Sequence, residues 1–217
     1  MALLRSSLGE VQGPIVRAPG IFLRAAAMSD YGAWAELRAA SREHLEPWEP
    51  QWSRDELTRH AFRRRVRHYQ REAREDTGYA FLLFAEPTRI AALSMGAWAV
   101  RRGTPVLTGG ATLSNVRRGV TQAATLGYWL GAPFTGCGLM STAVTSVCNF
   151  AFDVLRLHRV EAAIMPSNQP SIRLAERVGF QREGLARSYL RINGRWEDHL
   201  LYALIADERR GVPAAEA

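Results

Sequence analysis

The sequence has only two cysteines and no long apolar run. Cys137 and Cys148 lie eleven positions apart within one expected helical unit, where their side chains cannot meet in a disulfide. Because there is no CxxC pair and no Cys/His cluster at ligand spacing, we expect no metal site. No apolar segment is long enough to span a membrane, and the apolar run at the start is too short for a signal peptide. These absences predict a reduced, cytoplasmic protein.

Lysine is missing as well, so the basic residues are arginines. The 28 basic residues outnumber the 21 acidic ones, which gives a formal net charge of +7. Such a charge favours anionic partners: phosphates, nucleic acid or acidic protein surfaces. The run "FRRRVRH" (62–68) suits a contact with RNA or the ribosome, but a charge run on a helix is more often a solvated face. Composition leaves both interpretations open.

The 217 residues fit a single domain in which strands and helices follow one another. Residues 1–18 read as a loose arm, 19–208 as the domain and 209–217 as a tail. One helix is expected over 53–78, where Ser53 and Glu56 match a capping box and Gly78 ends the helix. Seven strands are expected, at 21–27, 79–84, 106–116, 123–130, 158–165, about 180–192 and 196–206. The fold class is therefore α/β with a mixed sheet of about seven strands.

The periodicity changes within residues 127–152. Tyr128, Trp129 and Leu130 form a short apolar strand, whereas apolar residues from Leu139 onward recur at helical spacing. Gly136 and Gly138 precede that helix. A helix N-terminus attracts anions, and glycine lets a phosphate approach the backbone closely. The spacing matches neither a P-loop nor a dinucleotide fingerprint. A strand-to-helix corner that simply needs glycine for its turn explains the motif equally well.

Three longer stretches bear on this choice: "GYWLGAPFTGCGLMSTAV", "HRVEAAIMPSNQPSIRLAERVGFQREG" and "NGRWEDHLLYAL". Together they resemble the GNAT acyltransferases. With "LSNVRRG" (113–119) and "HLEPWEPQW" (44–52), the sequence is more closely similar to the RimJ/RimL-type ribosomal-protein-alanine N-acetyltransferases. The resemblance covers roughly residues 20–206. It implies one GNAT-like domain with a mostly antiparallel sheet and helices on both faces. Residues 86–105, about 20 in number, form an unusual insertion that either extends a hairpin or covers the acceptor cleft.

The resemblance implies acetyl-CoA as the donor. Its pyrophosphate is expected on the backbone N–H groups at the start of the helix, and its pantetheine arm beside the preceding strand. In the GNAT signature a Gln or Arg stands three residues before the first glycine, and here that position is Pro133. The residues expected to contact acetyl-CoA are Tyr128, Trp129, Leu130, Gly136, Cys137, Gly138, Leu139, Met140, Ser141, Asn168 and Ser171.

Two residues are candidates for catalysis. By resemblance, Ser171 donates a hydrogen bond or a proton to the departing thiolate, while Asn168 holds the cofactor or a water. Both residues also suit a helix N-terminus. Glu161 stands in an otherwise apolar strand, where it is a candidate general base or a clamp for the substrate's ammonium; an ion pair with an arginine is the alternative.

Four further residues are weaker candidates for a functional role. Cys137 lacks a neighbour that would activate it as a nucleophile, and Cys148 is expected in the core. His158 and His199 have no companions at ligand spacing, so they read as structural residues.

The expected reaction is acetyl transfer to the N-terminal amine of a protein, beginning with alanine or serine and belonging to the ribosome. An α-amino group has a pKa of about 8, against about 10.4 for lysine, so it needs only modest help from a base. Direct attack in a ternary complex then suffices. The alternatives are acetylation of a small amine, or a non-catalytic module that binds acetyl-CoA or a ribosomal partner.

Overall fold

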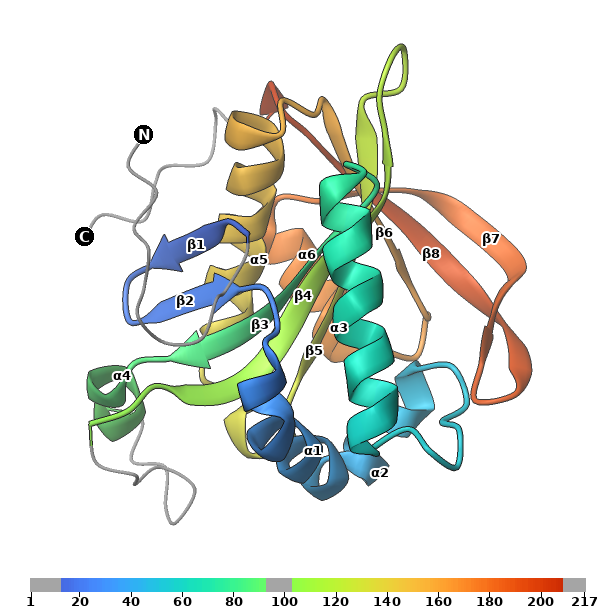
Figure 1. The fold of residues 1–217 in the computed structure, drawn as a ribbon. Coiled ribbons are helices and arrows are strands. Elements are labelled where there is room, and N and C mark those ends of the chain that lie inside the picture. The colour runs from blue at the N-terminus through green and yellow to red at the C-terminus, as the bar shows by residue number, and fades with distance from the viewer. Residues whose placement is uncertain (1–12, 93–102, 209–217) are drawn as a thin grey trace.

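The computed structural model describes residues 13–92 and 103–208, and these residues build one sheet with helices on both faces (Figure 1). The sheet has eight strands in the order β1-β2-β3-β4-β5-β6-β8-β7, and all neighbours are antiparallel except β5 and β6. The predicted fold class is confirmed. The strands are β1 (Ile15–Ala18), β2 (Ile21–Arg24), β3 (Tyr79–Ala85), β4 (Val106–Arg117), β5 (Ala123–Leu130), β6 (Arg159–Ile164), β7 (Gln181–Ile192) and β8 (Arg195–Ile205).

Helices cover both faces of the sheet (Figure 1). Helix α3 lies across one face, and α5 crosses the other with α6 beside it (Figure 1). None of the helices in the described ranges combines the length and the apolar composition needed to cross a membrane. The helices are α1 (Tyr31–Ala40), α2 (Arg42–Leu45), α3 (Arg59–Arg74), α4 (Pro87–Ala92), α5 (Leu139–Asn149) and α6 (Gln169–Val178), with short helical turns at Glu46–Trp48 and Phe150–Val154.

The eighth strand lies inside the segment that the sequence indicated as an arm. β1 pairs with β2 through a tight turn at Pro19-Gly20, where Gly20 has φ +71°. Val16 points inward and is only 8% exposed. Proline and glycine, which suggested a loose segment, instead form the turn of a hairpin.

Helix α3 is shorter than predicted, and the capping box at Ser53 and Glu56 is wrong. The helix begins at Arg59, and the N-cap is Thr58, whose hydroxyl accepts from the Ala61 N–H at 3.2 Å. Glu56 is instead bound by Arg65 of the helix. The helix ends at Arg74, before the predicted stop at Gly78. The ion pair between Glu56 and Arg65 thus takes the place of the capping interaction that the sequence predicted for Glu56.

The centre of the sheet is open. β5 and β6 pair in parallel only where Ala123–Thr125 meets Arg159–Glu161. β5 then continues to Leu130 along β4, while β6 continues to Ile164 along β8. The two strands therefore separate beyond Thr125, and the gap between them is where the candidate site lies.

Helix α5 closes one side of this gap because its apolar stripe is buried. The residues predicted for that stripe are all less than 9% exposed: Leu139, Met140, Ala143, Val144, Val147, Cys148, Ala151 and Phe152. Cys148, at 1% exposed, is a core residue as expected. The packing fixes the start of α5 beside the end of β5.

Candidate active site

A pocket of about 160 Å³ occupies the opening between β5 and β6. Its polar lining comes from Tyr128 on β5, Asn168 and Ser171 at the start of α6, and His199 on β8, with Trp48 at one side. Three residues predicted for the site, Tyr128, Asn168 and Ser171, thus lie together. They come from elements 40 residues apart in sequence, which only the splayed sheet brings into contact.

Local hydrogen bonds fix the geometry of the α6 end. The Asn168 side chain accepts from the Ser171 N–H at 3.2 Å, so Asn168 caps the helix as its sequence position indicated. The Tyr128 hydroxyl donates to the Ser171 carbonyl oxygen at 3.3 Å. Burial raises the pKa of Tyr128 to about 12, and hydrogen bonding with Ser171 opposes the rise. Tyr128 therefore remains protonated and ties β5 to α6.

The glycine segment before α5 has the shape of an anion cradle. Gly136 and Gly138 have φ of +75° and +74°, a left-handed conformation that L-residues adopt at a cost. A Cβ on Gly136 would meet nothing within 4 Å. Gly138 is the N-cap of α5, and no side chain caps that helix. The first N–H groups of α5 are thus left for a ligand, which fits the predicted pyrophosphate contacts.

Part of the expected insertion lies beside this segment. Arg89, on α4, donates from Nη2 to the Cys137 carbonyl oxygen at 3.4 Å, and Ile90 next to it is 1% exposed and anchors α4 in the core. Arg89 therefore places a positive charge at the glycine segment. Pro133, at the position where the GNAT signature has Gln or Arg, has no charged side chain. Of residues 86–105, the stretch 93–102 falls outside the described residues. Sequence periodicity gave no sign of Arg89, because its partner is 48 positions away.

The end of β5 presents an edge to the opening. Tyr128, Trp129 and Leu130 pair with β4 on one side, opposite Ala111, Gly110 and Gly109. On their other side β6 has turned away, so the backbone facing the opening has no strand partner among the paired residues of the sheet. The sequence analysis predicted an extended pantetheine arm along this edge, and that contact stays a prediction.

Glu161 is not part of the pocket. It lines a separate groove of about 540 Å³ with Arg117 and Tyr189. Its carboxylate pairs with Arg117 at 2.6 Å and with Arg159 at 2.9 Å. Arg159 also binds Glu183 on β7. The ion pair that the sequence left as the alternative is present.

A larger cleft of about 680 Å³ opens on the α3 side of the sheet. Arg38, 4% exposed, forms a two-pronged ion pair with Glu49 at 2.7 and 2.6 Å, and the Trp52 indole donates to Glu49 at 2.8 Å. These hydrogen bonds hold Arg38, Glu49 and Trp52 in fixed positions on one side of the cleft. Gly127 and Tyr128 line both the cleft and the smaller pocket. The two hollows therefore share this part of β5 as a wall.

Sequence reasoning also missed the position of His199, which it interpreted as a structural residue. It is 3% exposed and lines the smaller pocket. Its ring nitrogen Nδ1 lies 2.9 Å from the Glu197 carbonyl oxygen. A signal was available in the alternation of β8: Leu200, Tyr202 and Leu204 belong to the main core, which turns His199 to the opposite face.

The chain belongs to the GNAT acetyltransferase family. The family model "Acetyltransferase (GNAT) domain" matches residues 21–181. With the splayed sheet and the glycine cradle, this makes the protein an acetyl-CoA-dependent N-acetyltransferase, as predicted.

Particular relatives refine the comparison. The chain is 33% identical over 186 residues to "Probable N-acetyltransferase YjcK" of Bacillus subtilis (strain 168), covering 85% of this chain and 93% of that protein. It is 32% identical over 177 residues to the [ribosomal protein uS5]-alanine N-acetyltransferase of Escherichia coli (strain K12), covering 81% and 83%. The structure of Mycobacterium smegmatis RimJ in complex with CoA-disulfide superimposes with a TM-score of 0.75 at 32% identity, covering 90% of this chain and 87% of that one.

Proposed function

We propose that the protein transfers the acetyl group of acetyl-CoA to the N-terminal α-amine of a ribosomal protein that begins with alanine or serine. The observation that carries the proposal is that two hollows share Gly127 and Tyr128 as lining residues. The donor enters from the α5 side and the acceptor from the α3 side, so both substrates reach the same point without a covalent enzyme intermediate. Such a substrate places the protein in the cytoplasm, where ribosomal proteins are made.

The reaction needs one bond formed and one broken. The neutral amine attacks the carbonyl carbon of the thioester, the C–N bond forms, the C–S bond breaks and its electron pair stays on sulfur. Ser171, at the pocket end of α6, donates its hydroxyl proton or a hydrogen bond to that thiolate. Asn168 holds the turn that places Ser171 there, through the 3.2 Å cap. Holding both reactants in place supplies much of the acceleration.

The size and charge of the hollows favour a peptide N-terminus over a small amine. A pocket of about 160 Å³ accommodates the acetyl group and a small first side chain. Two carboxylates line the larger cleft, Glu49 and Glu56, and arginines already bind both of them. A polyamine would find no unpaired acidic lining there, which weakens the small-amine alternative. The Escherichia coli relative, which acts on a ribosomal protein's alanine by its name, agrees with the peptide assignment.

Intact-mass analysis with an acceptor panel tests the proposal. The panel holds peptides that begin with Ala, Ser or Met, a lysine peptide with a blocked N-terminus, and a polyamine. Acetyl is expected on the Ala and Ser peptides only. Acetyl on the polyamine alone would establish the small-amine alternative. Binding of acetyl-CoA without transfer to any acceptor would instead support a non-catalytic module.

Ser171→Ala tests the assigned acid. We expect turnover to fall about a hundredfold or more, which is the usual contribution of a general acid, while acetyl-CoA affinity stays within about twofold. Ser167→Ala is the matched control, because Ser167 is exposed in the same turn. Equal turnover in the Ser171 and Ser167 variants would remove Ser171 from the mechanism.

A further inference from the structure

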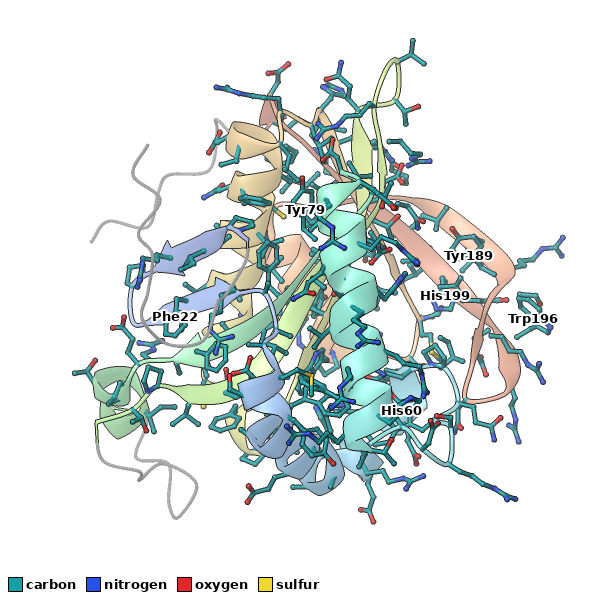
Figure 2. All side chains as sticks on the ribbon, viewed as in Figure 1. Phe22, His60, Tyr79, Tyr189, Trp196 and His199 are labelled. Carbon is teal, nitrogen blue, oxygen red and sulfur yellow. The ribbon has the colours of Figure 1, made fainter. Side chains whose placement is uncertain are left out.

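We propose that His199 is the general base that takes the proton from the attacking amine. The proposal rests on the function proposed above and adds the group that completes its proton balance. His199 comes from β8 and lines the same pocket as Ser171, which stands at the start of α6. Figure 2 shows His199 nearer to the body of the molecule than Trp196, which lies at the outer side of the same hairpin.

The hydrogen bond at Nδ1 sets the tautomer of the ring. Nδ1 lies 2.9 Å from the Glu197 carbonyl oxygen, and a carbonyl can only accept. Neutral His199 therefore carries its proton on Nδ1 and a lone pair on Nε2. No residue of the described ranges is paired with Nε2. A lone pair held in a substrate pocket by a bond at the opposite nitrogen is the arrangement that a general base requires.

Among the described residues, the surroundings of His199 offer no competing base. Tyr189 of β7 packs against the ring with centroids 6.0 Å apart, close to His199 in Figure 2. Tyr128 of β5 shares the pocket, and its pKa is raised to about 12, so it holds its proton. Trp48, Asn168 and Ser171, the other polar groups of the lining, are neutral. Glu161 lies in the separate groove, bound by two arginines.

The proton balance then closes within one pocket. As the C–N bond forms, the proton on the amine nitrogen passes to His199 Nε2, directly or through one water. As the C–S bond breaks, Ser171 supplies a proton to sulfur. The imidazolium of His199 returns its proton to solvent, and Ser171 is reprotonated from solvent, before the next cycle.

His199→Gln and His199→Ala test the proposal, with His158→Gln as the matched control because His158 is exposed outside the pocket. Acetylation of an alanine peptide by the wild type tests the proposed function itself. The role of His199 is tested separately, by comparing the variants with the wild type on whichever amine the wild type acetylates. We expect kcat/KM to fall by about 10²- to 10⁴-fold in both His199 variants, with acetyl-CoA affinity retained.

Two readouts separate a base from a structural residue. First, the acidic limb of the pH–rate profile should be lost in His199→Gln, and added imidazole should restore part of the activity of His199→Ala. Second, a peptide that begins with 3-fluoroalanine, whose amine deprotonates more easily, should show a smaller deficit than the alanine peptide. An unchanged acidic limb, or equal deficits with the two peptides and no imidazole rescue, would overturn the assignment.

A separate observation concerns Arg89: the geometry points to this residue as the cation that binds the phosphates of the donor. Its guanidinium reaches the Cys137 carbonyl oxygen, and its Nη2 would stand 3.9 Å from a Cβ placed on Gly138. The Arg89 side chain packs over Gly20, which leaves little room there for the stem to move away: a Cβ on Gly20 would lie 3.0 Å from the Arg89 Cβ. A short swing from the carbonyl would bring the charge onto a phosphate on the glycine segment. Arg89, from the insertion, thus supplies the positive charge that Pro133 does not carry.

Donors of different length test this second proposal. Arg89→Met should weaken CoA binding about tenfold in calorimetry and raise the KM for acetyl-CoA by a similar factor, whereas S-acetyl-pantetheine, which has no nucleotide phosphates, should be used equally well. Arg89→Lys should keep part of the affinity. Arg63→Met, an exposed arginine on the opposite face, is the control. Unchanged CoA affinity in Arg89→Met, or an equal loss with S-acetyl-pantetheine, would overturn the assignment.

Discussion

Replacing Gly138 by alanine separates the stability of the glycine segment from its use as an anion cradle. The residue has φ +74°, and an added Cβ would approach only the Arg89 guanidinium, at 3.9 Å. The cost to folding is therefore that of the left-handed backbone, about 1–2 kcal/mol. For a chain of this size that lowers Tm by roughly 2–8 °C. In the proposed complex with CoA, the same methyl group would crowd a phosphate that approaches the N–H groups of α5.

The effect on binding should be much larger than the effect on stability. Each charge-assisted hydrogen bond to a phosphate contributes about 1.5–3 kcal/mol, so losing even one weakens CoA binding at least about tenfold. Gly119→Ala is the matched control: Gly119 has φ +67° and open space around its Cβ, but lies in the β4–β5 turn. Calorimetric titration with CoA and a thermal melt of both variants decide the matter. Equal CoA affinity in the two variants would refute the cradle.

Three further predictions concern single side chains. Because the pKa of Tyr128 is raised to about 12, Tyr128→Phe should lower kcat yet keep both limbs of the pH–rate profile between about pH 6 and about pH 10; loss of a limb would contradict this. Arg159 lowers the pKa of Glu183, so this carboxylate stabilises the fold above its unfolded pKa, and the contribution is lost as pH falls through the folded value. Glu183→Gln should thus lower Tm slightly at neutral pH, with the two Tm-against-pH curves converging in acid; a constant gap would refute the pairing. Leu113 is fully buried, so Leu113→Ala should lower the free energy of unfolding by about 2–5 kcal/mol, measured by denaturant unfolding. A loss under about 1 kcal/mol would be inconsistent with its packing.

Local patterns in the sequence were enough to predict much of the site. The stripe from Leu139 to Phe152 placed α5, and Asn168 and Gly179 marked the two ends of α6, because period and capping act within one element. Ser171 and Tyr128 followed from the family resemblance, and the structure brings them into one pocket. The roles proposed for these residues stay predictions until the variants are measured.

The features that the sequence did not predict depend on tertiary contacts. Arg89 reaches Cys137 across 48 positions, and His199 reaches the pocket because β6 and β8 pair while β5 and β6 separate. No local period encodes such distances. Glu161 is a mixed case, because its apolar strand suggested a desolvated acid. Arg159, which binds it, stands only two residues away on the same strand, whereas the second partner, Arg117, is 44 positions away. Side chains whose partners are distant in sequence are those that sequence reasoning places least well.

The site of acetylation on one peptide tests the central claim most directly. The peptide begins with alanine, carries one internal lysine and is incubated with the protein and acetyl-CoA, after which tandem mass spectrometry locates the acetyl group. The protein itself contains no lysine, so it adds no competing lysine amine to the reaction. The account predicts acetyl on the alanine α-amine alone, because that amine enters the pocket beside Tyr128 and deprotonates more easily than lysine. Acetyl on the lysine side chain, with the α-amine unmodified, would contradict it.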